Sequence, residues 1–147
     1  KDGENFSAAQ VARLLQEHPD VAIAAAYGVP CAVSDELVMA ALALRPGARF
    51  DPMDFHAFCE RQVDSGGMDR KWFPDFVRVV DDFEYTETQK VLVRILKRAH
   101  FDLRRLPQAE IYWRERGDAE FRCFTREDFE RLRRDFAAAE RERLLDA

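Results

Sequence analysis

The residues best suited to chemistry lie in two short segments, Thr86-Glu87-Thr88-Gln89-Lys90 and the opening Lys1-Asp2-Gly3-Glu4-Asn5. The chain holds 23 cationic residues, and only four of them are lysines, Lys90 included. A lysine ammonium is a compact point charge that a planar guanidinium does not replace. A lysine retained in such an arginine-rich chain therefore marks a candidate anion-binding group, with an ordinary solvated lysine as the alternative.

The predicted surroundings of Lys90 favour the first interpretation. The apolar spacing that follows predicts a helix from about Lys90 to His100. A cation in the first turn opposes the positive end of the helix dipole. Such a placement is reasonable if the lysine and the helix N-terminus grip one anion together. The polar residues 81–89 before it are predicted to form a surface loop.

Other kinds of site are not indicated by the sequence. It contains neither G-x-G-x-x-G nor a P-loop, and no serine or cysteine stands in a nucleophile context. The three cysteines and three histidines are scattered, and no histidine has an evident orienting partner. We therefore predict reduced thiols, no disulfide and no metal site. Acidic pairs in the predicted turns are interpreted as solvated loop charges.

Composition narrows the class of protein. The chain has 147 residues, 47% hydrophobic and 35% charged, with a formal net charge of −5. This balance indicates a folded domain and argues against a nucleic-acid binder, which needs a basic face. No apolar run is long enough to span a membrane, and no signal peptide is evident. The chain opens without methionine or a targeting pattern, so we expect a piece of a longer, cytoplasmic protein, with peripheral membrane association left open.

The helices and strands that position residues 1–5 and 86–90 are predicted from helix-capping residues and from apolar runs. Ser7 and Asp51 are predicted to cap two helices, and residues 21–27, 36–44 and 76–80 are predicted strands. With the helix after Lys90, the order predicts an α+β fold in which a small sheet of about three strands is covered by helices.

The last third of the chain has a different composition, in which arginine and acidic residues are frequent and mixed. We predict a domain over residues 1–100 and a C-terminal extension over residues 101–147. In the extension, residues 111–113 and 121–124 are expected to pair as a hairpin, followed by a long helix capped by Thr125.

These motifs, in this order, resemble the C-terminal domain of the acyl-adenylate-forming (AMP-binding) ligases. Thr86-x-Thr88-x-Lys90 is similar to the terminal T-x-x-G-K motif of that superfamily, in the shorter T-x-T-x-K form of fatty-acid transport proteins and very-long-chain acyl-CoA synthetases. Gln89 stands where most members have glycine. The other segments that carry the resemblance are Gly3-Glu4-Asn5-Phe6-Ser7, His18-Pro19-Asp20-Val21, Tyr27-Gly28-Val29-Pro30, Phe101-Asp102, Tyr112 and Phe124-Thr125.

The resemblance implies a mobile lid whose much larger N-terminal domain, the holder of ATP, Mg²⁺ and the carboxylic acid, is absent from this chain. It implies that Lys90 is the adenylation lysine, delivered by a loop that can swing. It also implies that Gly3, Glu4 and Asn5 form part of the tunnel for the pantetheine arm of CoA in the second half-reaction.

Two further groups of residues enter through the same resemblance. Thr86 and Thr88 are expected to support the loop that carries the lysine. Arg94, Lys97 and Arg98 are candidate contacts for the phosphates of CoA, with a solvated helix face as the alternative.

The implied function is that of the C-terminal domain of an ATP-dependent fatty acyl-CoA synthetase, inactive alone and with no cofactor bound to this piece. Its partners would be its own N-terminal domain and the small molecules fatty acid, ATP and CoA, without nucleic acid. Two alternatives stay open: the lid of an acyl-AMP ligase that loads a carrier protein, and a stand-alone α+β interaction module.

Overall fold

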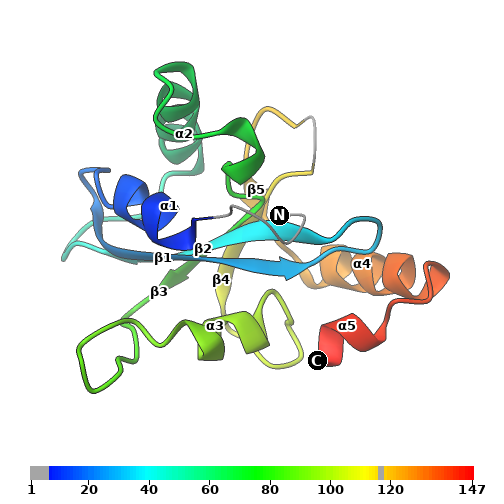
Figure 1. The fold of residues 1–147 in the computed structure, drawn as a ribbon. Helices are drawn as coiled ribbons and strands as arrows, with labels where there is room; N and C mark the ends of the chain where they lie inside the picture. Colours follow the sequence, from blue (N-terminus) through cyan, green and yellow to red (C-terminus); the bar gives the residue numbers. More distant parts are fainter. Residues whose placement is uncertain (1–6, 116–117) are drawn as a thin grey trace.

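A computed structural model describes residues 7–115 and 118–147, and Figure 1 shows the path of the chain. None of the helices in these two ranges is long and apolar enough to cross a membrane. In chain order the elements are α1 (Ala8–Leu15), β1 (Val21–Pro30), β2 (Glu36–Leu44), α2 (Pro52–Asp64), the 3₁₀ turn η1 (Arg70–Trp72), β3 (Phe76–Val80), α3 (Val93–Ala99), β4 (Glu110–Trp113), β5 (Arg122–Cys123), α4 (Arg126–Ala138) and α5 (Arg143–Asp146).

The fold is α+β, as predicted, around one mixed sheet with the strand order β1-β2-β3-β4-β5. Strands β2 and β3 are parallel, and the other neighbouring pairs are antiparallel. The expectation of about three strands is wrong, because β4 and β5 add two more to the sheet. Strand β4 pairs along β3, with Ile111 opposite Arg78, and so covers a backbone edge that would otherwise be unpaired.

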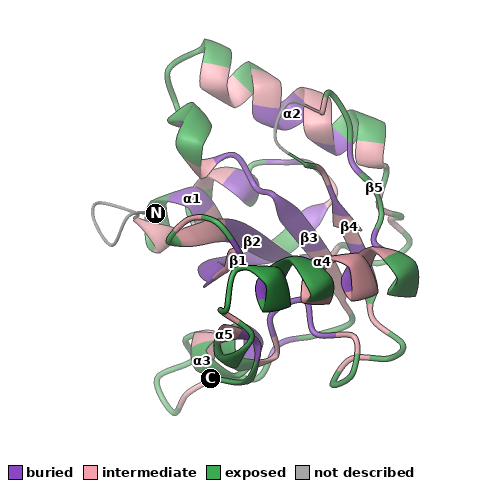
Figure 2. Cartoon of the chain, turned by 90° about the vertical axis from the view of Figure 1, so that its right-hand side faces the viewer, coloured by how far each residue is buried: buried purple, intermediate pink, exposed green. Residues whose placement is uncertain are grey.

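Helices cover both faces of this sheet, and the side-chain alternation of the strands divides the core in two. Ala24 and Ala26 of β1 face the cluster formed with α1 and α2. Ala25 and Tyr27 face the opposite cluster, beside α3 and α4. This is the period of two expected when a strand is buried on both faces. Figure 2 shows β1 and β2 almost wholly buried between exposed helix surfaces.

Local signals account for most element boundaries. The Asp51 side chain accepts hydrogen bonds from the backbone N–H groups of Met53 and Asp54, at 3.0 and 3.1 Å, and so starts α2. Strand β1 runs three residues further than predicted, through Gly28. Its added residues, through Pro30, keep the antiparallel pairing with β2.

The predicted hairpin of the C-terminal third is confirmed by the antiparallel pairing of β4 with β5. Helix α4 begins at a full capping box between Thr125 and Asp128. Its buried Phe129 and Phe136 join the same core cluster as Phe76 of β3. The proposed division of the chain after residue 100 stays a prediction.

Candidate functional site

Lys90 ends a tight hairpin turn and does not lie in a helix. The Thr86 N–H donates to the Lys90 carbonyl oxygen at 2.7 Å, and the Gln89 N–H donates to the Thr86 carbonyl oxygen at 2.9 Å. Tyr85 and Val91 then pair as an antiparallel bridge. This compact structure, residues 85–91, is called the lysine turn below.

The prediction that Lys90 occupies the first turn of a helix is therefore wrong. Helix α3 begins only at Val93. The Lys90 carbonyl oxygen, which in a helix would accept an N–H four residues further on, instead accepts the Thr86 N–H, and the Leu92 N–H donates across the hairpin to the Glu84 carbonyl oxygen at 2.8 Å. These backbone groups are used in strand-like pairing and do not form a helical turn. The idea that a helix N-terminus assists Lys90 loses its basis with this geometry.

The two threonines of the motif hold the lysine turn together. The Thr86 hydroxyl oxygen accepts a hydrogen bond from the Lys90 backbone N–H at 3.2 Å and lies 3.1 Å from the Thr88 hydroxyl oxygen. Thr86 therefore contacts Lys90 through both its backbone and its side chain. The structure thus brings Thr86, Thr88 and Lys90 together, the arrangement expected of a supporting loop.

Gln89 is a feature that the sequence analysis did not explain. Its backbone has φ of 65°, in the left-handed region. Three-residue hairpin loops commonly place a left-handed residue, usually glycine, at this third position. A glutamine costs about 1–2 kcal/mol there. The aromatic and β-branched pair Tyr85 and Val91, on either side of five polar residues, was the available sign of a hairpin.

The lysine turn is anchored at both of its ends, because Val91, its last residue, packs against the same core cluster that contains Phe83. Phe83, just before it, is 7% exposed and packs in the core with α3. A hollow of about 620 Å³ lies between residues 78–84, α3 and residues 106–110. Figure 1 shows the turn projecting from the body of the molecule between β3 and α3. The predicted surface loop is therefore a projecting turn whose two ends are fixed to the core by Phe83 and Val91.

The Lys90 side chain is exposed, and no hydrogen bond or ion pair to it occurs within residues 7–115 and 118–147. Lys97, by contrast, lies 3.7 Å from a carboxylate oxygen of Glu36. An ammonium group on a preformed turn, with its three N–H donors unused, can neutralise an anion supplied from outside the chain.

The other predicted site residues lie elsewhere. Arg94, Lys97 and Arg98 are exposed on α3, and with Arg141 they line a hollow of about 470 Å³. The structure thus gathers these cations, one of which is already paired with an acid. Gly3, Glu4 and Asn5 lie outside the described residues.

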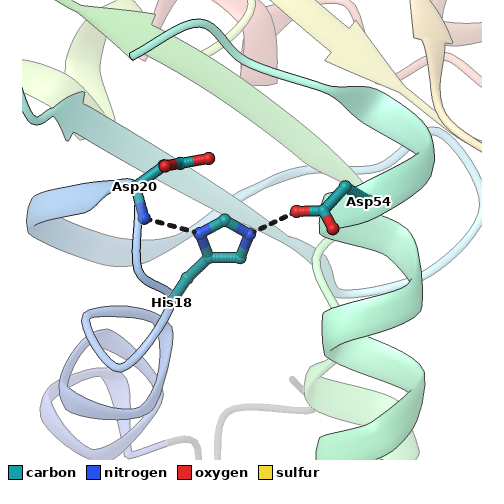
Figure 3. A group of neighbouring side chains, drawn as sticks. All are labelled: His18, Asp20 and Asp54. Atoms are coloured by element: carbon teal, nitrogen blue, oxygen red, sulfur yellow. Dashed lines mark hydrogen bonds and ion pairs between the residues drawn. The ribbon is translucent and has the colours of Figure 1, made fainter. Parts of the chain in front are cut away.

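One histidine has an orienting partner that the sequence analysis missed. The His18 ring accepts the Asp20 backbone N–H at Nδ1, at 3.0 Å, so Nε2 carries the proton and donates to the Asp54 carboxylate at 2.7 Å. Figure 3 shows the ring between these two partners. Ligand atoms of His18, Asp20 and Asp54 lie within 4.8 Å of one another. The ring has no free lone pair in this arrangement, which joins the end of α1 to α2 and does not form a metal-binding group.

The AMP-binding enzyme C-terminal domain family has a model that matches residues 10–90, a range that ends at Lys90. The steroid-22-oyl-CoA synthetase of Rhodococcus jostii is 36% identical over 144 residues, which cover 98% of this chain and 25% of that protein. The medium/long-chain-fatty-acid–CoA ligase FadD17 of Mycobacterium marinum is 43% identical over 95 residues, 65% of this chain and 18% of the relative. The chain thus spans a quarter or less of the length of these relatives.

Solved structures show the same fold. An acyl-CoA synthetase from Brucella canis matches with a TM-score of 0.60 and 23% identity, over 70% of this chain and 19% of that one. The amide bond synthetase McbA from Marinactinospora thermotolerans matches with a TM-score of 0.53 and 31% identity, over 61% of this chain and 17% of that one.

Proposed function

The chain belongs to the AMP-binding enzyme C-terminal domain family, and from that premise we propose that it is the lid of an ATP-dependent acyl-CoA ligase in which Lys90 serves the adenylation step. The observation that carries the proposal is the exposed ammonium of Lys90, which has no partner within residues 7–115 and 118–147, on a projecting hydrogen-bonded turn. The relatives named for fatty acids and for a steroid acid support an apolar carboxylic acid as the substrate class.

The chemistry of adenylation needs such a group. The carboxylate oxygen attacks the α-phosphorus of ATP, a C–O–P linkage forms, and pyrophosphate leaves with its electron pair. Two anions must approach, so negative charge gathers on the phosphoryl and carboxylate oxygens. An ammonium that reaches both oxygens in a site closed to water stabilises this transition state by about 3–4 kcal/mol. Because Lys90 has no partner to give up within the described residues, its full charge is available.

The other half of the site would come from outside this chain. An N-terminal domain would hold ATP, Mg²⁺ and the acid, and we assign none of the residues described here as a ligand of Mg²⁺. For the second half-reaction, Gly3, Glu4 and Asn5 are proposed to contact the pantetheine arm of CoA. Arg94, Lys97 and Arg98 offer charge to its phosphates. The isolated chain is accordingly expected to be inactive.

The test is Lys90→Ala in the full-length enzyme, with both half-reactions measured separately. The rate of acyl-AMP formation, measured by the exchange of labelled pyrophosphate into ATP, should fall about 100-fold or more. Conversion of preformed acyl-AMP and CoA to the thioester should survive. Lys71→Ala, which removes another exposed lysine, is the matched control. Equal loss in both half-reactions, or loss in neither, would contradict the assignment.

A further inference from the structure

Three described residues other than glycine have a left-handed backbone: Gln89, His100 and Glu140. The His100 ring is buried, 2% exposed, and bonds the Leu145 carbonyl oxygen at 3.0 Å, so its contacts offset the backbone cost. Glu140 directly follows Ala139, the C-cap residue of α4, a position where left-handed residues are common. At Gln89 the three-residue hairpin loop accounts for the left-handed backbone, but it favours glycine and does not explain a glutamine.

The Gln89 side chain also does nothing for the fold. It is exposed, and no hydrogen bond to its carboxamide occurs in the part of the chain that the structure describes. Thr86 stabilises the lysine turn through its hydroxyl, and the Gln89 contribution to the turn is its backbone N–H alone. Glycine would supply that N–H without the steric cost. A long polar side chain is thus held, at a cost in free energy, directly beside Lys90.

We propose that the Gln89 carboxamide is a second substrate-contacting group of the adenylation step. This inference rests on the proposed function of Lys90. Consecutive Cα atoms lie 3.8 Å apart, so any movement that delivers Lys90 to an acid–ATP pair delivers Gln89 as well. A carboxamide offers two N–H donors without charge. Its role is to donate a hydrogen bond to a phosphoryl or carboxylate oxygen of the reacting pair, while Lys90 supplies the positive charge.

The experiment uses two substitutions in the full-length enzyme, measured by pyrophosphate exchange with ATP and a long-chain fatty acid as probes. Gln89→Gly removes the amide and relieves the backbone. Its kcat/KM for adenylation should fall about tenfold or more, the usual effect of losing a hydrogen bond to a charged group. Gln89→Glu keeps the shape of the side chain and places a negative charge against the anionic substrates. Its kcat/KM for adenylation should therefore fall further than that of Gln89→Gly.

Two controls separate contact from other effects. Thermal melting of the 147-residue chain should show Gln89→Gly at least as stable as the parent, which excludes misfolding of the turn as the cause of lost activity. Glu87→Gln changes the charge of the same turn by one without touching Gln89. If Gln89→Glu acts only through long-range charge, Glu87→Gln should raise the rate by a similar factor, and that result would contradict direct contact.

The inference is overturned if Gln89→Gly adenylates as fast as the parent enzyme or faster. Lys90→Ala, measured in the same assay, distinguishes this failure from failure of the proposed function. If Lys90→Ala adenylates as fast as the parent enzyme, both proposals are contradicted. If Lys90→Ala loses adenylation activity while Gln89→Gly keeps all of it, only the proposed role of Gln89 is contradicted.

Discussion

The lysine turn and the segment that follows α3 differ in where their charged groups find partners. In the segment after α3, the side chain of Asp102 is fully buried and accepts two parallel hydrogen bonds from the Arg104 guanidinium, each 2.9 Å long. Arg104 also reaches Asp146 in α5 at 2.9 Å. On the lysine turn, Lys90 is exposed and no bond to its ammonium is formed within the described ranges.

This difference separates charge used for folding from charge available for chemistry. A buried carboxylate needs its hydrogen bonds, because burial without them is costly. Burial raises the pKa of Asp102, but the hydrogen bonds and charge of Arg104 outweigh it and hold the pKa below its ordinary value. The partners of Asp102 thus act within the chain, whereas a partner for Lys90 must come from elsewhere.

The largest effect on folding is expected from Asp102→Asn. The amide keeps the shape of the side chain but turns an N–H group toward the donors of Arg104. The free energy of unfolding should fall by about 2–3 kcal/mol, since the carboxylate is buried while Arg104 is partly exposed. Urea denaturation measures this. Asp81→Asn, an exposed control, should change it by less than about 0.5 kcal/mol. A loss equal to that control would show that the pair contributes nothing.

A smaller effect is expected from acidification, through His100. Burial lowers the pKa of His100 below its ordinary value of 6.5. Its Nε2 atom bonds the Leu145 carbonyl oxygen, and Nδ1 has no hydrogen-bond partner within the described residues. Between pH 6.5 and the lower pKa of the folded state, the unfolded chain therefore binds the proton first. The stabilisation is complete above pH 6.5 and is lost as the pH falls below it.

Urea denaturation at a series of pH values measures this dependence. His100→Gln keeps a donor for Leu145 and should flatten the decline. His56 also has a lowered pKa, chiefly from burial, so His56→Gln is the necessary companion variant. An unchanged pH profile in His100→Gln would contradict the role assigned to this ring.

The smallest effect on folding is expected from Lys90→Ala. An exposed side chain that has no partner among the residues the structure describes contributes little to stability, so the free energy of unfolding should change by less than about 0.5 kcal/mol. Thermal or urea denaturation of the chain provides the measurement. A loss comparable to that of Asp102→Asn would mean that Lys90 has a structural partner, and the contrast between the two regions would disappear.

Elements with strong local signals were predicted well from the sequence. The apolar runs gave the bounds of β2 and β3, and Asp51 followed by Pro52 gave the start of α2. Those signals act over a few residues, so they are readable without the fold. The family was also recognisable, because its motifs keep their order along the chain.

The features that were missed are of two kinds. Some depend on contacts between residues far apart in the sequence, and one depends on a left-handed backbone position that is not occupied by glycine. His18 meets Asp54 across 36 positions, and β4 joins the sheet from the charged C-terminal third. Residues 81–89 were predicted as a surface loop and the helix was predicted to begin at Lys90; the hairpin was missed because Gln89 occupies a left-handed position where glycine would have indicated one. Of the predicted site, Thr86, Thr88 and Lys90 are brought together, and the roles of Arg94, Lys97 and Arg98 stay predictions.

Single-turnover kinetics on one preparation of the full-length Lys90→Ala enzyme test whether Lys90 serves the adenylation step. The rate constant for acyl-AMP formation is expected to fall about 100-fold or more, while the rate constant for thioester formation from supplied acyl-AMP stays near that of the Lys71→Ala control. An adenylation rate equal to that of the control would contradict this role of Lys90.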